Sequence, residues 1–378
     1  MLRWLRDAWV IAGITLLLVL VVDAVLNNGF GPEPWPAVDP DAVAPDRADA
    51  EFFQTDPKLM QYWQEHGAAR AMRWTPYVYW RRQPHAGEQI NVDDEGIRRS
   101  WTSAEREPGW TLWVAGGSSV WGTGVDDDST VPSWIARLLA EAGEPAQVIN
   151  LGESGYVTGQ SLAFVQERLR HAESPDLVLF LEGANDVFAA LQAGRAGVPQ
   201  NEGNRTLDFR TTDGVEKWIM AFPRALEGIR GFVAPVVDPD SLDLDALAAD
   251  VVSVYLENRR QARAVLAVHG SDTLHAWQPT IFGRFEPSAF EQQVLGASLQ
   301  HHRDLQQRAD ARISVSPADD HQLVLTNVFD RVRETVFMDP LHLGPGGNRT
   351  IAAAVVPSLL EWRALQVGDG SLAEPATE

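Results

Sequence analysis

Residues 111–119 read TLWVAGGSS, an apolar run that ends in two glycines and two serines, and this pattern is the most informative one for the fold. Its first five residues have the β-branched and aromatic side chains that are typical of a buried strand. Gly116 and Gly117 let the chain turn sharply and present the hydroxyl of Ser118 at the start of the next segment. Open α/β sheets place their functional side chains at such strand ends. The stretch therefore predicts a strand of a parallel sheet that leads into a functional serine.

Short apolar strands alternate with helices from this stretch to the end of the chain. The alternation favours a mainly parallel five-stranded sheet covered by helices on both faces, a three-layer α/β/α sandwich. The expected strands are residues 111–115, 147–150, 177–181, 273–277 and 322–327. The expected helices are residues 131–141, 159–171, 246–268, 288–309 and 346–365.

Two further blocks of polar residues and glycines follow the second and third strands. The first is NLGESGY, residues 150–156, in which Gly155 can bring a bare backbone N–H close to a ligand, although a simple turn also explains it. The second is GAND, residues 183–186, in which the Asn185 carboxamide can donate to a developing oxyanion. Helix capping explains an asparagine at this place equally well.

A fourth block, DPLH, covers residues 339–342 near the end of the chain. A carboxylate three residues before an imidazole can hold the ring in one tautomer and orientation, so Asp339 can orient His342. The second ring nitrogen is then available to take a proton from a serine. An incidental histidine in a surface loop is the alternative, since the chain has nine histidines.

The order and the strand-end placement of the four blocks resemble the SGNH (GDSL-like) hydrolase superfamily over residues 110–362. The resemblance implies a flavodoxin-like α/β fold and a serine esterase that needs no metal and no cofactor. It implies a catalytic triad of Ser118, Asp339 and His342. It also implies an oxyanion hole formed by the N–H groups of Ser118 and Gly155 and the carboxamide of Asn185.

The first block departs from the family pattern, because GGSS stands where the family name-giving motif reads GDSL. Many members of the family resemble this variant, so the departure does not indicate a loss of activity. It leaves Ser119 as a second candidate for the nucleophile. Two more segments are similar to those of bacterial members: NVDDEGIR at residues 91–98 and WQP at residues 277–279.

The first 26 residues predict a single membrane anchor. Arg3 and Arg6 precede an apolar run over residues 8–22, which spans about 22 Å as a helix and about 28 Å if it continues to Leu26. By the positive-inside rule the rest of the chain then lies on the periplasmic or extracellular side. A cleaved signal peptide and a buried core helix remain alternatives, although no good small-residue cleavage site follows.

The segments around the main domain have distinct compositions. Residues 27–50 are rich in Pro, Ala and Asp and are expected to be a linker, and residues 51–109 are crowded with aromatic residues. Strands are expected there at residues 75–80 and 88–92, with a turn at residues 94–96. The aromatic rings either stack on carbohydrate or, as we favour, pack a small β module onto the main domain.

The main domain is expected over residues 110–365. An insertion at residues 190–245 interrupts its alternation and is either a lid over the site or a surface excursion. Residues 366–378 are expected to be a disordered tail.

Charge and composition exclude several functions. The formal net charge is −21, which disfavours a nucleic-acid partner, and the chain has no cysteine for a thiolate site or a disulfide. The favoured function is hydrolysis of an O-acyl ester, such as an acetyl ester, of a glycan or lipid outside the membrane. An O-acyltransferase acting on a cell-surface polymer and a non-catalytic envelope or glycan-binding protein are the alternatives.

Overall fold

The structure is a computed structural model that describes residues 9–10, 13–18, 50, 52–53, 56–105, 107–203, 205–206, 237–296, 299–317 and 321–369. The chain divides into two compact units. The first unit comprises Met1–Asp39 and Asn201–Asp238, and the second comprises Pro40–Gln200 and Pro239–Glu378. The strands and helices named below all belong to the second unit.

A five-stranded sheet forms the centre of the second unit. Its strands are β5 (Thr111–Gly116), β6 (Gln147–Asn150), β7 (Leu177–Glu182), β8 (Asp272–Trp277) and β9 (Gln322–Val324). They pair in the order β6-β5-β7-β8-β9, and every pair is parallel. This is the 2-1-3-4-5 order of flavodoxin-like folds. The predicted parallel sheet is confirmed, with a last strand that ends three residues earlier than expected.

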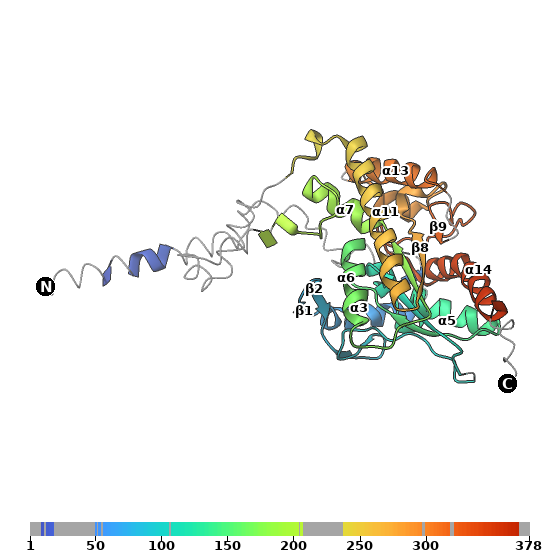
Figure 1. Cartoon of the computed structure of the whole chain (residues 1–378). Helices are drawn as coiled ribbons and strands as arrows, with labels where there is room; N and C mark the ends of the chain where they lie inside the picture. Colours follow the sequence, from blue (N-terminus) through green and yellow to red (C-terminus); the bar gives the residue numbers. More distant parts are fainter. Residues whose placement is uncertain are drawn as a thin grey trace, which may run out of the picture. The chain divides into compact units, whose positions relative to one another are not determined.

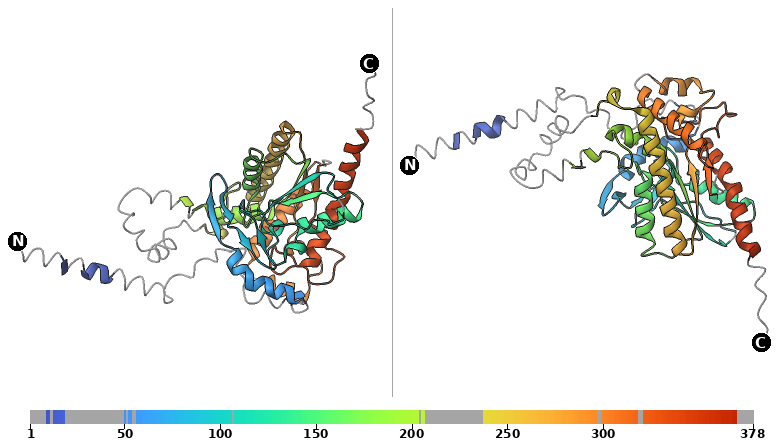
Figure 2. Two further views of the ribbon diagram at one scale, coloured as in Figure 1. Left: turned by 90° about the horizontal axis from the view of Figure 1, so that it is seen from below. Right: turned by 45° about the horizontal axis from the view of Figure 1, so that its top comes forward.

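Helices cover both faces of this sheet (Figure 1). On one face α5 (Val131–Glu141) and α14 (Pro345–Asp369) pack against each other. On the other face lie α6 (Thr158–Arg168), α7 (Ala184–Ala193), α11 (Leu244–Val268) and α13 (Gln300–Ser314), and Figure 2 shows the strands between the two groups. Side chains of a strand alternate between the faces, so Trp113, Ala115, Val178 and Phe180 point together into the core under α6 and α11.

Two predicted helical boundaries are wrong. The expected helix at residues 288–309 is two helices, α12 (Ala289–Val294) and α13, because Gly296 lies in the break and Ser288 caps α12 in a capping box with Glu291. The last helix continues to Asp369, so residues 366–369 of the expected tail are helical. Residues 370–378 lie outside the described residues.

The region before the sheet contains a helix that the sequence did not suggest. It is α3 (Pro57–Ala69), and four short strands follow it: β1 (Met72–Thr75), β2 (Tyr79–Arg82), β3 (His85–Ala86) and β4 (Asn91–Val92). The expected strand at residues 75–80 is wrong, because residues 76–78 form the turn of the β1–β2 hairpin. The β-branched and aromatic side chains of this stretch predict a strand, but two of its residues are unsuited to one. Pro76 has no N–H to donate to a neighbouring strand, and Tyr77 has φ of 68°. The expected turn at residues 94–96 is confirmed, with Gly96 at φ of 83°.

Buried charges connect this region to the loop that follows β6. Glu153 is fully buried, and its Oε2 accepts a hydrogen bond from the Arg82 backbone N–H at 2.8 Å. The guanidinium groups of Arg81 and Arg82, both buried, lie 3.5 and 3.3 Å from the same carboxylate. A buried charge is tolerated when an opposite charge and hydrogen bonds compensate its lost hydration. The hairpin and the loop after β6 therefore form one packed unit.

The predicted anchor and linker lie mostly outside the described residues. Of residues 1–26, the structure describes 9–10 and 13–18, and of residues 27–50 it describes Ala50. Among the residues that the structure describes, no helix is both long enough and apolar enough to cross a bilayer.

Candidate active site

The serine of the first block begins a short helix directly after β5. This helix, α4, covers Ser118–Trp121, and Gly117 occupies the position before it. A Cβ atom on Gly117 would lie 2.2 Å from Nδ2 of Asn185, which is closer than any side chain tolerates. A side chain at this position would therefore displace the Asn185 carboxamide, which packs against the backbone beside Ser118.

Ser118, His342 and Asp339 form a continuous series of hydrogen bonds. The Ser118 hydroxyl lies 2.7 Å from Nε2 of His342, and Nδ1 of His342 lies 2.6 Å from Oδ2 of Asp339. The other carboxylate oxygen of Asp339 accepts the backbone N–H groups of Leu341 and His342, both at 2.8 Å. Because Nδ1–H donates a hydrogen bond to Asp339, the proton of the neutral ring lies on Nδ1, and Nε2 can accept from the serine hydroxyl. The three side chains are between 1 and 4% exposed.

The second candidate nucleophile makes different contacts. The Ser119 hydroxyl donates to the backbone carbonyl of Leu341 at 3.1 Å and accepts from the Gln278 side chain at 3.4 Å. These bonds connect α4 to the loop that carries His342 and to the WQP segment after β8. Ser118 therefore contacts His342, whereas Ser119 bonds to Leu341 of the loop that carries His342 and to Gln278 after β8.

Asn185 does not cap its helix. The position before α7 is Gly183, and Asn185 lies inside the first turn, where its Nδ2 donates to the backbone carbonyl of Tyr156 at 2.9 Å. Its Oδ1 accepts from the Gln200 side chain at 3.4 Å, which fixes the amide with its N–H groups toward Gly117 and Tyr156. The helix-cap interpretation of this residue is therefore wrong.

Gly155 lies in the same loop as Tyr156 and has φ of 72°, a left-handed conformation that favours glycine. A Cβ atom there would lie 3.0 Å from Oε1 of Gln200 and 3.6 Å from the ring of Trp80. Asn185 and the Tyr156 carbonyl thus lie beside Gly117, directly before Ser118, and Gly155 precedes Tyr156 in the chain. Gln200 and Trp80 border this place too, and no motif in the sequence marked either of them.

Arg98 holds the carboxyl end of α4. It is 1% exposed, and its guanidinium donates to the carbonyls of Trp121, Gly122 and Val125 at 2.7–2.9 Å. Nε of Arg98 also donates to Asp127 at 2.9 Å. A four-residue helix is not stable by itself, so these bonds to its last carbonyls help to keep Ser118 in place. Arg98 lies in the NVDDEGIR segment, whose similarity to family members was the only sequence signal for it.

Two carboxyl groups are buried, Glu182 at the end of β7 and Asp186 in the first turn of α7, and Asp186 is bonded to the segment that follows Gly155. Asp186 accepts both the backbone N–H of Thr158, at 3.2 Å, and the Thr158 hydroxyl at the start of α6. Burial raises the pKa of Asp186 to about 6 even though the bonds from Thr158 act in the opposite direction. Burial, and then the charge of Asp186, also raise the pKa of Glu182, at the end of β7.

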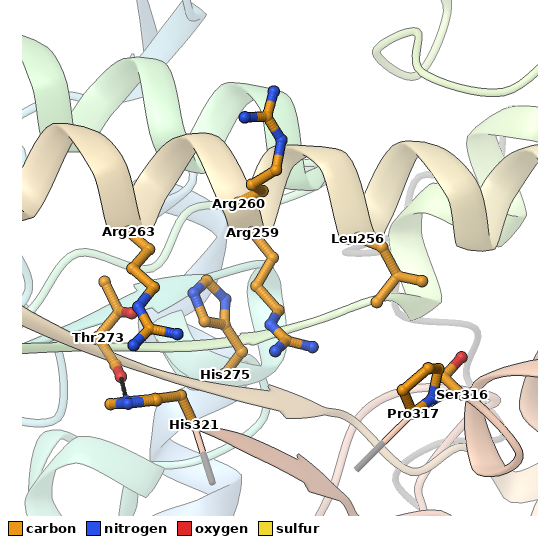
Figure 3. Close-up of a pocket in the computed structure, with 9 residues that line it drawn as sticks. All are labelled: Leu256, Arg259, Arg260, Arg263, Thr273, His275, Ser316, Pro317 and His321. Atoms are coloured by element: carbon orange, nitrogen blue, oxygen red, sulfur yellow. Dashed lines mark hydrogen bonds between the residues drawn. The ribbon is translucent and has the colours of Figure 1, made fainter. Parts of the chain in front are cut away.

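A basic pocket of about 370 Å³ lies apart from these residues, between α11, β8 and the start of β9 (Figure 3). Arg259, Arg263 and His321 line it around the ring of His275, whose pKa is lowered well below its usual value by burial and then by these neighbouring side chains. Its one serine, Ser316, donates its hydroxyl to the Arg312 carbonyl. The pocket therefore has no serine paired with a base. In the part of the chain that the structure describes, no three His, Asp or Glu side chains are grouped to hold a metal ion.

The model of the GDSL-like lipase/acylhydrolase family matches residues 114–350, more than half of the chain. The chain is also similar to the lipase Lip_vut3 from a goat rumen metagenome, at 11% identity, over 66% of this chain and 97% of the other, with a TM-score of 0.40. It is similar to the carbohydrate acetylesterase Est24 from Sinorhizobium meliloti at 11% identity, over 67% of this chain and 99% of the other, with a TM-score of 0.36. It is also similar to the acetylxylan esterase Axe2 from Geobacillus stearothermophilus at 17% identity, over 66% of this chain and 94% of the other, with a TM-score of 0.30. No curated protein matches the sequence.

Replacing Asp186 by Asn should remove a pH dependence of stability. A carboxyl group with a raised pKa in the folded state binds its proton more tightly there than in the unfolded chain. The protonated Asp186 therefore stabilises the fold fully below pH 3.8, its pKa in the unfolded chain, and this stabilisation is lost as pH rises through the folded-state pKa of about 6. The asparagine oxygen still accepts from Thr158. We expect the stability of Asp186→Asn relative to the native chain to rise by roughly 1–3 kcal/mol between pH 4 and pH 8. Urea unfolding across that range measures it, with the exposed Asp330→Asn as the control, and a pH-independent difference would contradict the expectation.

Proposed function

Because the chain belongs to the GDSL-like lipase/acylhydrolase family and is a carboxylic ester hydrolase, we propose that it cleaves an O-acyl ester through a covalent acyl-enzyme on Ser118. One observation carries the proposal. The Ser118 hydroxyl, the His342 ring and the Asp339 carboxylate form one hydrogen-bonded series with separations of 2.7 and 2.6 Å. A serine hydroxyl is a weak nucleophile unless an adjacent base takes its proton.

Acylation begins with proton transfer from Ser118 Oγ to Nε2 of His342 as Oγ attacks the ester carbonyl. The imidazolium that forms is stabilised by the Asp339 carboxylate, which stays ionised and accepts a hydrogen bond from Nδ1–H. The backbone bonds from Leu341 and His342 to the other oxygen of Asp339 keep this carboxylate in one orientation. Collapse of the tetrahedral intermediate breaks the ester C–O bond, and the alcohol leaves with the proton from His342.

The negative charge of the tetrahedral intermediate would be stabilised by the backbone N–H groups of Ser118 and Gly155 and by the Asn185 carboxamide. The N–H of Ser118 is the first of a helix and has no acceptor within it. Asn185 donates one of its two N–H bonds to Tyr156, and the second is available beside Gly117. Water, activated by His342, then attacks the acyl-enzyme, releases the acid and restores Ser118.

We further propose that residues 1–26 anchor the chain in a membrane with the hydrolase on the periplasmic or extracellular side. The support is the sequence itself, in which Arg3 and Arg6 precede the apolar run over residues 8–22. An ester substrate of this enzyme would then be part of a lipid or a glycan outside the cytoplasmic membrane.

Ser118→Ala should lower the turnover of p-nitrophenyl acetate by at least about 10³-fold, because the nucleophile is lost. Its melting temperature should stay close to that of the native chain, since only one hydroxyl is removed. Ser119→Ala is the matched control. It breaks the bond to the Leu341 carbonyl and should keep turnover within about tenfold. Activity that survives in Ser118→Ala and is lost in Ser119→Ala would move the nucleophile by one residue.

Asn185→Ala should lower kcat by about 10²–10³-fold with little change in KM, because an oxyanion donor acts mainly in the transition state. Asn348→Ala provides the comparison, since Asn348 is also buried and its amide also donates to a backbone carbonyl, that of Ser129 at 3.0 Å. It should lose stability and retain kcat. Equal kinetic behaviour of the two variants would exclude Asn185 from the oxyanion hole.

The full-length chain should sediment with membranes, resist extraction by alkaline carbonate and dissolve in detergent. Protease added to the outer face should digest the hydrolase domain while the membrane stays intact. N-terminal sequencing of the mature protein is the decisive measurement. A soluble chain that begins after Leu26 would show that the segment is a cleaved signal peptide.

A further inference from the structure

The β1–β2 hairpin carries three aromatic rings in a row, Trp74, Tyr79 and Trp80, which we call the aromatic ladder. The centroids of Trp74 and Tyr79 are 5.4 Å apart, those of Tyr79 and Trp80 are 6.3 Å apart, and both pairs are inclined by 29°. Trp74 is 70% exposed, whereas Trp80 is partly buried. The ladder thus leads from the solvent into the domain, and Figure 1 shows its hairpin beside α6.

The inner end of the ladder touches the loop of the candidate active site. Nε1 of Trp80 donates to the Ser154 carbonyl at 2.8 Å, and its ring lies 3.6 Å from the Cβ position of Gly155. The Tyr156 hydroxyl donates in return to the Trp80 carbonyl at 2.6 Å. The Tyr156 carbonyl accepts from Asn185, so the ladder is continuous with the residues that border Ser118.

Two tyrosines of the hairpin, Tyr77 in the turn and Tyr79 of the aromatic ladder, have a backbone conformation that is unfavourable for tyrosine. Tyr77 and Tyr79 have φ of 68° and 73°, in the left-handed region that side chains other than glycine rarely adopt. The turn between them is fixed from below, because Val78 is buried and its carbonyl accepts from Gln160 of α6 at 2.8 Å. Glycine would adopt both conformations without strain, yet tyrosine occupies both positions. Strain of this kind is retained where a presented side chain has a use.

The chemistry of the ladder suits sugar rings. A pyranose has a face of C–H groups that packs on the face of an indole, while its hydroxyl groups stay in water. Exposed, rigid rings without a charge of their own bind such a ligand with little loss of side-chain entropy. An anionic lipid surface is disfavoured, because the chain carries a net charge of −21 and is repelled by it.

We propose that the aromatic ladder is a glycan subsite, and that the ester cleaved at Ser118 is carried by a sugar chain whose neighbouring rings stack on Trp74. The inference rests on the proposed esterase function and names its substrate class. The acyl group enters beside Gly155 and Asn185, and the sugar chain extends outward along the hairpin. The exposed ring of Tyr77, in the hairpin turn, adds a second contact surface.

The test compares three substrates on the full-length protein in detergent: p-nitrophenyl acetate, partially O-acetylated xylohexaose and partially O-acetylated cellohexaose. Trp74→Ala should raise KM for an acetylated hexasaccharide about tenfold, leave its kcat nearly unchanged and leave both constants for p-nitrophenyl acetate unchanged. Trp74→Phe retains a ring and should keep KM within about threefold. Phe285→Ala is the matched control, because it removes an aromatic ring that is 75% exposed but lies outside the aromatic ladder. It should leave KM and kcat unchanged for every substrate.

A second variant separates binding from folding. Tyr77→Gly relieves the left-handed backbone, so its melting temperature should not fall, while KM for the acetylated hexasaccharides should rise. A purely structural role of the hairpin predicts the reverse, a stability change without a substrate-dependent change in KM.

Three results would overturn the inference. The first is an unchanged KM for the hexasaccharides in both Trp74→Ala and Tyr77→Gly. The second is a native enzyme that cleaves p-nitrophenyl acetate but acts on neither hexasaccharide better than on an acetylated monosaccharide. The third is a loss of turnover by Trp74→Ala only on phosphatidylcholine vesicles, which would make the ladder a lipid contact. Failure of the esterase proposal itself is seen separately, as turnover that survives in Ser118→Ala.

Discussion

Parallel pairing of β5 with both of its neighbours is the constraint on which the rest of the site depends. Strand β5 lies between β6 and β7, with Val114 opposite Asn150 and Gly116 opposite Leu181. Because parallel strands end at the same edge of a sheet, the loops after these three strands start side by side. Ser118 and Asn185 lie in the first turns of the helices that follow β5 and β7, and Gly155 lies in the loop that follows β6, so this pairing starts all three segments at one edge.

The loop that carries His342 connects β9 to α14, and His342 lies far along it from the end of β9, so strand pairing alone does not place this residue. The Pro340 carbonyl accepts from Ile281 after β8, and the Leu341 carbonyl accepts from Ser119 of α4. Met338 and His342 also pair through their backbone at 2.9 Å. The carboxylate of Asp339 then orients the imidazole within this fixed loop. A histidine in an untethered loop would lose most of its effectiveness as a base, because catalysis depends on positioning to within a fraction of an ångström.

The region before the sheet acts as a second support for the same edge. Three of its arginines, Arg81, Arg82 and Arg98, are buried, and their charges are compensated by Glu153 and Asp127 and by backbone carbonyls. Compensation of this kind rarely adds much net stability, but removal of one partner leaves a buried charge and is strongly unfavourable. The contacts of Arg81, Arg82 and Arg98 therefore act as geometric constraints on the loops after β5 and β6. The same region contains the aromatic ladder, so the β1–β2 hairpin both packs against the loop after β6 and exposes Trp74 to solvent.

Local sequence patterns predict the five strands, most of the helices and the four blocks at the strand ends. Apolar periodicity and glycine placement are local properties, and they suffice to place Ser118, Gly155 and Asn185 at one edge once the sheet is parallel. Tertiary structure decided everything that depends on contacts between distant residues. His342 meets Ser118 rather than Ser119, Asn185 donates across the loop rather than capping its helix, and Arg98 holds α4 from the lead-in segment. The turn at residues 76–78 and the break in the helix expected at residues 288–309 also escaped prediction, because a single proline or glycine weighs little against a strong apolar or helical pattern. Which of two adjacent hydroxyls faces a base 224 positions away is set by packing, and no local pattern encodes it.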